Sequence, residues 1–280
     1  MQIISLLENS TNNPLLGSEH GLSLFLESNG HKILFDTGET SLFAENARIL
    51  GVNLQDIDCV VISHGHSDHG GGLQTFLALN KTAKIFVRED GFGPYYSQRE
   101  DDAYHYIGLD RNLLESKQLV FTGVEHQLYS GISLFSGVTG TKFFPKGNKT
   151  LLKKIGETYI PDDFSHEQNL VVEEEGVCLL IAGCAHRGIV NILEAFHTKR
   201  GYFPTHVIGG FHLFNHRTGE PESDETLSLI ATYLQKTGAK FYTCHCTGAY
   251  SFNFLHAKLG NTIEYLSGGT HLTIEKEKNI

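Results

Sequence analysis

Three histidines and an aspartate stand within six consecutive positions of this chain. The run reads Ser63-His64-Gly65-His66-Ser67-Asp68-His69-Gly70-Gly71. Imidazole and carboxylate groups bind zinc, iron and manganese, and ligands at alternating positions can converge on one ion where a chain leaves a strand. The glycines let the backbone turn tightly beside them. The run therefore predicts a metal site. The alternative is a solvated polar loop, but such a loop would not explain why the histidines are so close together in the sequence.

The elements around this run must bring it to a buried place. An apolar strand at Cys59–Ile62 leads directly into it. Strands before it are predicted at Gln2–Glu8, Gly21–Ser28 and His31–Asp36, with Asn29-Gly30 as a hairpin turn. A helix over Thr40–Leu50 is expected to end at Gly51. A second helix, Gly71–Asn80, and a strand, Lys84–Arg88, follow the run.

A similar order of elements recurs in the second half of the chain. Strands are predicted at Leu170–Glu174, Val177–Ala182, His206–Ile208 and Phe241–Cys244, and helices at Gly188–Thr198, Glu222–Lys236 and Gly248–Leu259. Two such halves predict one α/β domain over residues 1–280, in which two sheets face each other and the helices lie outside. This is a four-layer αββα sandwich.

The middle of the chain, from Asp90 to Asp163, is less regular. Gly91–Tyr96 is predicted to be an aromatic loop, and strands are predicted at Leu119–Thr122 and Ile132–Phe135. Five lysines stand between Thr141 and Lys154, and we expect them to form a solvated basic loop or to attract an anion.

Composition limits the partners. The chain has 280 residues, is 40% hydrophobic and carries a net charge of −10. The negative charge argues against nucleic acid or an anionic membrane surface as the main partner, because both are negatively charged and bind proteins with excess Lys and Arg. The N-terminal residues lack the features of a signal peptide, no apolar run is long enough to span a bilayer, and the five cysteines show no disulfide-scaffold spacing. We therefore expect a cytoplasmic protein with reduced thiols.

The His-rich run resembles the hallmark of the metallo-β-lactamase superfamily, His-x-His-x-Asp-His after a buried strand. Four further segments fall where that family has motifs. They are Phe35-Asp36-Thr37-Gly38, Gly183-Cys184-Ala185-His186, Gly209-Gly210-Phe211-His212 and Cys244-His245-Cys246-Thr247-Gly248. The resemblance covers essentially the whole chain and implies a sandwich with two mixed β-sheets.

The resemblance also implies a ligand set. His64, His66 and His186 would hold one metal ion, whereas Asp68, His69 and His245 would hold a second. Asp36 would be a buried group that braces the His-rich loop through hydrogen bonds. Zinc is the expected metal, as one or two ions, with iron or manganese as alternatives.

One departure from the family concerns the aspartate that usually bridges the two metals after the fourth-motif strand. No acidic residue stands between His206 and Thr218. His212 is the remaining strong ligand type there, and it could bind a metal, contact substrate or be packed. Cys184 and Cys246 flank expected ligands; thiolate ligation is chemically possible, but we expect packed thiols.

The amino-acid sequences of several segments are similar to those of one subgroup of that superfamily. The similar segments are Ser18–Ser23, Pro161–Phe164 with Glu167-Gln168, Gly183–Asn191, Gly209–Leu213 and His245–Gly248. This subgroup includes a tetrahydromethanopterin-pathway enzyme, which joins a dihydropterin-methyl diphosphate to an aminobenzene ribofuranosyl phosphate, and many metal-dependent hydrolases. The resemblance therefore specifies the scaffold better than the substrate.

A small anionic substrate is expected. Thr247 and Gly248 open a predicted helix whose free N–H groups could receive a phosphate or carboxylate, and Arg187 stands at another helix start. His20 precedes a strand and could line the pocket. Seven further histidines are expected to be exposed or packed: His31, His105, His126, His197, His216, His256 and His271.

The working hypothesis is a metal-dependent hydrolase in which a metal-activated hydroxide attacks the substrate. His66 and Asp68 are the predicted catalytic residues, with Asp68 orienting the nucleophile and accepting a proton. One alternative is a transferase like the pterin enzyme. Another is a non-catalytic sensor that binds a small ligand through its metal.

Overall fold

Two seven-stranded sheets form the centre of the computed structural model, which describes residues 1–99 and 103–276. The first sheet has the order β20-β1-β2-β3-β4-β5-β8. Its strands are β1 Gln2–Leu7, β2 Ser23–Ser28, β3 His31–Phe35, β4 Cys59–Val61, β5 Lys84–Arg88, β8 Leu119–Thr122 and β20 His271–Thr273. The second sheet has the order β19-β18-β15-β14-β13-β10-β9. Its strands are β9 Glu125–Tyr129, β10 Ile132–Ser136, β13 Gln168–Glu174, β14 Val177–Ile181, β15 His206–Gly209, β18 Lys240–Thr243 and β19 Ile263–Tyr265.

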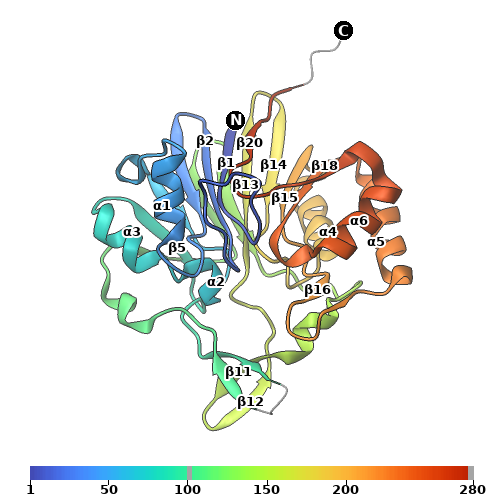
Figure 1. Ribbon diagram of the computed structural model, residues 1–280, viewed down its shortest axis with the longest axis horizontal. Coiled ribbons are helices and arrows are strands. Elements are labelled where there is room, and N and C mark those ends of the chain that lie inside the picture. Colours follow the sequence, from blue (N-terminus) through green and yellow to red (C-terminus); the bar gives the residue numbers. More distant parts are fainter. Residues whose placement is uncertain (100–102, 277–280) are drawn as a thin grey trace.

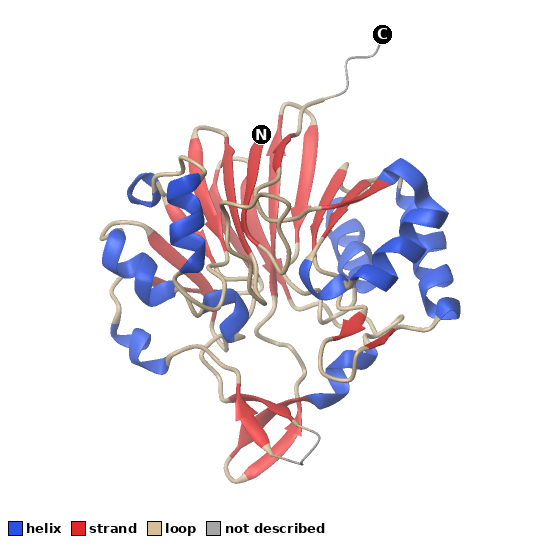
Figure 2. Cartoon of the chain, in the orientation of Figure 1, coloured by secondary structure: helices blue, strands red, loops and turns tan. Residues whose placement is uncertain are grey.

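Helices cover the outer face of each sheet (Figure 1). Helices α1 (Leu42–Ile49) and α3 (Leu73–Leu79) lie on the first sheet, and α4 (Ile189–Arg200), α5 (Asp224–Thr237) and α6 (Ala249–Leu259) lie on the second. Figure 2 shows the same layers by element type. The expected four-layer αββα sandwich with two mixed sheets is therefore confirmed.

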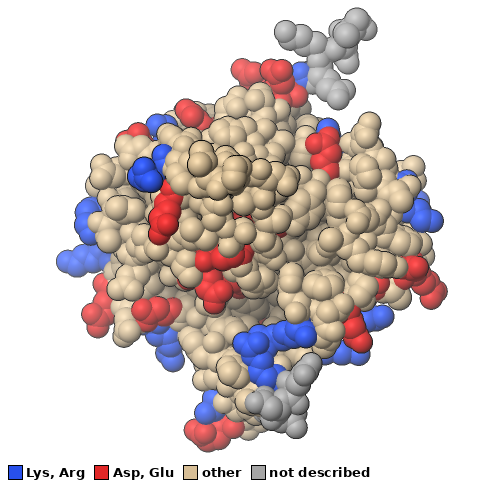
Figure 3. Space-filling model, in the orientation of Figure 1, with Lys and Arg blue, Asp and Glu red and all other residues tan. Residues whose placement is uncertain are grey.

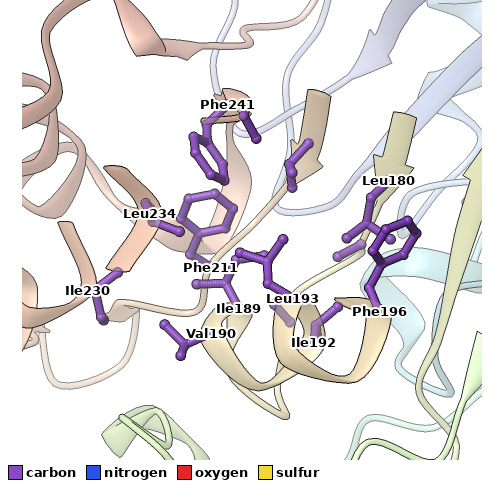
Figure 4. Close-up of a cluster of buried hydrophobic side chains, with 14 of the residues drawn as sticks. Leu180, Ile189, Val190, Ile192, Leu193, Phe196, Phe211, Ile230, Leu234 and Phe241 are labelled. Carbon is purple, nitrogen blue, oxygen red and sulfur yellow. The ribbon is translucent and has the colours of Figure 1, made fainter. Parts of the chain in front are cut away.

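Three buried clusters hold the layers together. One joins the two sheets, for example through Ile33 and Leu179. A second packs α1 and α3 on the first sheet through Phe43 and Phe76. The third packs α4 and α5 on the second sheet, and Figure 4 shows its Phe196, Phe211 and Phe241 rings among aliphatic side chains. Apolar burial on both faces of each sheet explains why its central strands are nearly continuous apolar runs.

Local signals in the sequence match the observed turns and caps. Asn29 and Gly30 both have positive φ, 52° and 76°, as a two-residue hairpin between β2 and β3 requires. Gly51, which follows the end of α1, has φ 76°. Ser223 caps α5 by accepting a hydrogen bond from the Thr226 N–H group.

The middle segment is more regular than predicted. Strands β6 (Tyr95–Gln98), β7 (Tyr104–Tyr106), β11 (Leu151–Ile155) and β12 (Thr158–Pro161) form a small antiparallel sheet with the order β12-β11-β6-β7. The predicted aromatic and basic loops were therefore wrong in part, because their ends pair as strands. The lysine segment contains a 3₁₀ turn, Lys146–Thr150, before β11. This small sheet projects beyond the large sheets, at the edge where β11 and β12 are labelled (Figure 1).

The carboxyl ends of the parallel strands set the position of the predicted site. Strands β3, β4, β5 and β8 run parallel to one another, as do β14, β15, β18 and β19. Parallel neighbours end at the same edge of a sheet, and the loops that follow them form the usual ligand site of such folds. The His-rich run follows β4, and the predicted ligands His186 and His245 follow β14 and β18.

Candidate metal centre

The His-rich run forms a loop and one helical turn after β4. The turn is α2 (Ser67–Gly70), which His66 precedes in an extended conformation. A Cβ atom at Gly65 would lie 2.3 Å from the Gly91 carbonyl oxygen, and one at Gly71 would lie 2.2 Å from that of Glu39. Both positions therefore require glycine, because neighbouring backbone presses on the loop from two sides.

His64 and His186 face each other across the first half of the site. Their Nε2 atoms are 3.3 Å apart. The Nδ1 atom of His64 lies 2.9 Å from the Ser63 hydroxyl, and that of His186 lies 2.9 Å from Asn148 Oδ1. The His66 ring lies beside both, with centroid distances of 4.6 and 4.9 Å.

The second half of the site has the same construction. The Nε2 atoms of His69 and His245 are 3.2 Å apart, and Asp68 Oδ2 lies 3.5 and 3.2 Å from them. The Nδ1 atom of His69 lies 2.7 Å from Asp36 Oδ2, and that of His245 lies 2.7 Å from Asn9 Oδ1. In both halves an oxygen atom lies at hydrogen-bond distance from each Nδ1 atom, and the two Nε2 atoms face each other.

Asp36 braces the loop as predicted. Its Oδ1 atom accepts the Ser63 N–H group at 2.7 Å, and its Oδ2 atom accepts the Ser63 hydroxyl at 2.7 Å besides facing His69. The prediction that Asp36 is a buried bracing group is confirmed.

Other bracing residues were missed in the sequence. Glu8 Oε1 accepts the His245 N–H group at 2.7 Å, and the two oxygens of Glu167 accept the N–H groups of His186 and Arg187. Both carboxyl groups are buried. The available signal was an acidic residue at the end of an apolar strand, as at Glu8, but nothing in a single sequence indicates its distant partner.

The pKa shifts differ between the two halves of the site, and His69 is the ring that they leave protonated. Burial, followed by the neighbouring imidazoles, lowers the pKa of His64 and of His186 well below the usual range, so both rings are neutral with free lone pairs. Burial raises the pKa of Asp68, but His69 and the hydrogen bonds from His20 and His245 outweigh it and hold this pKa well below its usual range. Burial likewise opposes a charge on His69, whereas Asp68 and Asp36 raise its pKa to about 9.

His212 also lies at this centre. Its ring centroid is 4.3 Å from that of His186, and neither ring nitrogen has a hydrogen-bond partner although both are buried. Its backbone has φ 48°, and its N–H group donates to Cys246 Sγ at 3.3 Å. This arrangement leaves the imidazole free to bind a metal or a substrate.

A further histidine and aspartate meet His66 on the side of the small sheet. His166 Nε2 lies 3.0 Å from Asp162 Oδ2, and the same oxygen lies 3.8 Å from His66 Nε2. His166 Nδ1 accepts the Gly65 N–H group at 2.9 Å. Neither residue was predicted to act at the site; both are buried and fix the side of the loop that carries His66.

A cavity of about 320 Å³ opens on these groups. It is lined by His20, His66, Asp68, Cys184, His186, His212 and His245, and by residues that were not predicted, among them Arg99, His216 and Arg217. His20 Nε2 lies 3.3 Å from Asp68 Oδ2. Burial, with His20 and His245, lowers the pKa of His216 to about 4, so that ring is neutral.

Three predicted substrate residues do not line this cavity. The Arg187 guanidinium donates to the carbonyl oxygens of Asp163 and Gly140 instead. The Thr247 hydroxyl accepts the Phe211 N–H group, and Gly248 packs so closely on Phe214 that a Cβ atom there would lie 2.4 Å from it. The start of α6 is therefore covered by the segment after β15, which sequence alone did not show.

Comparisons with known proteins point to one superfamily. The family model described as the metallo-beta-lactamase superfamily matches residues 16–187. An uncharacterized protein of Methanocaldococcus jannaschii is 27% identical over 274 residues, which cover 93% of this chain and 99% of that protein. The 7,8-dihydropterin-6-methyl-4-(β-D-ribofuranosyl)-aminobenzene-5′-phosphate synthase of the same organism is 30% identical over 271 residues, which cover 90% of this chain and 89% of the synthase.

A solved structure extends the likeness to three dimensions. The crystal structure of a metal-dependent hydrolase of the β-lactamase superfamily has a TM-score of 0.83 and 30% identity to this chain, and the match covers 99% of this chain and 100% of that one. The chain belongs to the metallo-β-lactamase superfamily.

Proposed function

We propose that this protein is a metal-dependent hydrolase that acts on a small anionic substrate. The observation that carries the proposal is the pair of facing Nε2 atoms in each half of the site, 3.3 and 3.2 Å apart. A metal ion bound there would replace the proton that each pair of facing nitrogens otherwise shares. The donor set, imidazoles with one ionised carboxylate, fits zinc, with iron or manganese as alternatives. His69, whose pKa is raised to about 9, would release its second proton when the ion binds.

Residues from both halves would hold the metal. His64, His66 and His186 would bind one ion, and Asp68, His69 and His245 a second, with the free imidazole of His212 beside them. When bound, such an ion lowers the pKa of water from about 15.7 toward about 7 and polarises the oxygen of the attacked group.

The chain's own residues would orient the nucleophile and remove a proton. Asp68 Oδ2 lines the cavity as an ionised carboxylate and can accept a proton from the attacking water. His20 Nε2, 3.3 Å away on a side chain that is 46% exposed, connects that oxygen to solvent. His66, whose Nε2 atom lies 3.8 Å from Asp162 Oδ2, would hold the ion together with His64 and His186.

An anionic substrate is supported by two arginines in the cavity wall. The Nη1 atom of Arg217 is buried and has no hydrogen-bond partner. Burial and the nearby Arg99 lower the pKa of Arg217, as expected where two cations share a pocket. Figure 3 shows basic side chains gathered at the base of the small sheet, beneath the acidic ones at the middle of this face. A phosphate or carboxylate group would relieve this repulsion.

The partner and compartment are proposed from coarser features. Among the described residues, no helix combines the length and apolar character needed to cross a bilayer. The net charge of −10 favours a small-molecule partner over nucleic acid or a membrane surface. All five cysteines are free, which supports the cytoplasm.

A transferase is the second candidate, because the relative named as a dihydropterin-aminobenzene-phosphate synthase is 30% identical to this chain. The same metals would then stabilise a diphosphate leaving group. Side-by-side assays with phosphodiesters, lactones and a pterin-methyl diphosphate with its aminobenzene acceptor separate the two reactions. Tight metal binding without turnover on this panel would favour a metal-dependent sensor.

The test removes the metal and then single side chains. Chelated protein should lose turnover and regain it with zinc, iron or manganese. His66→Ala and Asp68→Ala should each lower kcat about 100-fold or more with the fold intact. The first variant lacks a proposed metal ligand, and the second lacks a positioned acid–base group, which contributes about that factor. His271→Ala, on an exposed position of β20, is the matched control and should keep full activity. Full activity of the metal-free protein or of either active-site variant would contradict the proposal.

A further inference from the structure

The Cys184 thiol lies between the two halves of the metal centre. Cys184 follows β14 and is 3% exposed. Its Sγ atom is 3.1 Å from His69 Nε2. This sulfur atom belongs to one group of possible ligand atoms with Asp68, His69 and His245. It belongs to another group with His64 and His186. The atoms of each group lie within 4.8 Å of one another.

We propose that the Cys184 thiolate is a metal ligand shared by the two halves of the site. This proposal rests on the metal dependence proposed above. The sulfur, which follows β14, would take the role of the bridging aspartate that the resemblance leads us to expect after β15, because no acidic residue stands between His206 and Thr218.

The surroundings of the five cysteines distinguish a ligand from a packed thiol. Cys59, Cys178 and Cys244 are members of the hydrophobic clusters that hold the layers together. Cys184 is as buried as these three but belongs to none of the clusters of the described residues. Instead, imidazole nitrogens and a carboxylate surround its sulfur atom. A thiol that only fills space in the core is not stabilised by polar neighbours. A thiolate that binds a metal lies beside the other ligands, which are imidazole and carboxylate groups.

The backbone before Cys184 presses this sulfur against the His-rich loop. A Cβ atom at Gly183 would lie 2.2 Å from the Ser63 hydroxyl oxygen and 3.2 Å from His64 Nδ1. Only glycine permits such an approach between the ends of β14 and β4. The close approach places the next side chain, Cys184, inside the ring of ligands.

Cys246 has a different role, although it lies nearby. Its sulfur atom accepts the His212 N–H group at 3.3 Å and donates to the Cys184 carbonyl oxygen at 3.5 Å. Cys246 also forms a third group of possible ligand atoms with Cys184 and His212, but only Cys184 belongs to the two groups that contain the proposed ligands as well. We assign Cys246 to positioning the segments around the site, and Cys184 to the metal.

The chemistry of the step is simple. The Cys184 thiol releases one proton to solvent as its sulfur donates an electron pair to the ion, and no oxidation is involved. Soft thiolate ligands favour zinc and iron over manganese. The shared sulfur should therefore bias this site toward zinc or iron.

The test uses Co²⁺ as a spectroscopic probe, because cobalt–thiolate bonds produce a near-ultraviolet charge-transfer band that cobalt–imidazole and cobalt–carboxylate bonds lack. The metal-free wild-type protein is titrated with Co²⁺, and bound metal is counted by elemental analysis. The band should appear in the wild type and in Cys246→Ser and Cys178→Ser. It should be lost in Cys184→Ser and in Cys184→Asp, and the latter should keep the wild-type number of ions, because its carboxylate is also a ligand.

A second measurement needs no variant. X-ray absorption of the zinc-loaded wild type should show a sulfur neighbour at about 2.3 Å besides nitrogen and oxygen at about 2.0–2.1 Å. Far-ultraviolet circular dichroism of each variant shows whether it has folded.

The outcomes separate the two proposals. If wild type binds Co²⁺ without the band, or if Cys184→Ser keeps the band, the sulfur ligand is disproved while metal dependence stands. A band that disappears only in Cys246→Ser also overturns the assignment. If the wild type binds neither Co²⁺ nor zinc, the proposed function fails as well.

Discussion

Single oxygen atoms on neighbouring elements orient the imidazoles of the metal centre. Ser63, Asn148, Asp36 and Asn9 each face one Nδ1 atom, so each ring presents its Nε2 atom to the cavity. Hydrogen bonds of this kind fix the tautomer and strengthen the ligand. Asp36 makes the most of these contacts, because its carboxyl group faces both Ser63 and His69.

Replacing Asp36 should therefore weaken metal binding more than it changes the fold. In Asp36→Asn, an amide oxygen and nitrogen replace two acceptors, so either His69 or Ser63 loses its acceptor. Metal affinity should fall about 10- to 100-fold, as found when such partners are removed. Isothermal titration with zinc measures this change. Asp56→Asn, at a position that is 51% exposed, is the matched control, and an equal loss of affinity in both variants would refute the role of Asp36.

The ends of β4 and β14 meet more closely than two strands of different sheets usually do. Gly183 makes this contact possible, since any larger side chain there would overlap Ser63. The loop that carries three histidines and the segment after β14 that carries Cys184 and His186 are thereby held together. The geometry of the site thus depends on the distance between two sheet edges.

Gly183→Ala should disturb this contact. The added methyl group forces Ser63 or β14 to move, which costs about 1–3 kcal/mol in a well-packed interior and displaces the ligands. We expect a lower melting temperature together with weaker zinc binding. Gly123→Ala is the control, because its Cβ atom would meet nothing nearer than 3.9 Å. Unchanged zinc affinity in Gly183→Ala would show that the ligands tolerate this shift.

The strands of the small sheet could not be predicted from the periodicity of hydrophobic residues. Strands β6, β7, β11 and β12 are short, and their tyrosines pack on one another: the rings of Tyr104 and Tyr159 stack with centroids 3.9 Å apart. Strands of three to five residues are too short to show a clear alternating pattern, and β6 pairs with β11, which lies far from it in the sequence, so their pairing could not be predicted. Their position beside the cavity is a tertiary property.

Metal binding should stabilise the whole molecule. The proposed ligands come from loops after β4, β14 and β18, so an unfolded chain cannot present them together. An ion that binds only the folded state stabilises it by about 2.7 kcal/mol at a free concentration of 100 times its Kd.

Thermal unfolding tests this linkage directly. Addition of zinc to the metal-free protein should raise the melting temperature, and chelation should reverse the increase. The shift should be smaller in Asp68→Ala than in His271→Ala, because only the first variant lacks a ligand. A zinc-independent melting temperature in the wild type would contradict a metal site built from both sheets.

The sequence by itself determined the layers and the motif residues. Strand and helix positions follow from apolar patterning, turn residues and caps, all of which act over a few neighbouring positions. For the same reason the run from His64 to His69, and the bracing group Asp36, could be recognised from local spacing and family resemblance.

The packing of the two sheets determines which side chains share the cavity. Asn148 and Arg217 reach the centre from distant segments, and nothing in the local pattern around either residue differs from ordinary surface or core positions. Glu8, Glu167 and Cys184 stand at a strand end or within motifs, but their partners at the centre became visible only in the folded chain. Conversely, Arg187 and Thr247 stand beside ligands in the sequence but bond to backbone groups. Side-chain direction depends on how two sheets pack against each other, and that packing is set by contacts between residues far apart in the chain.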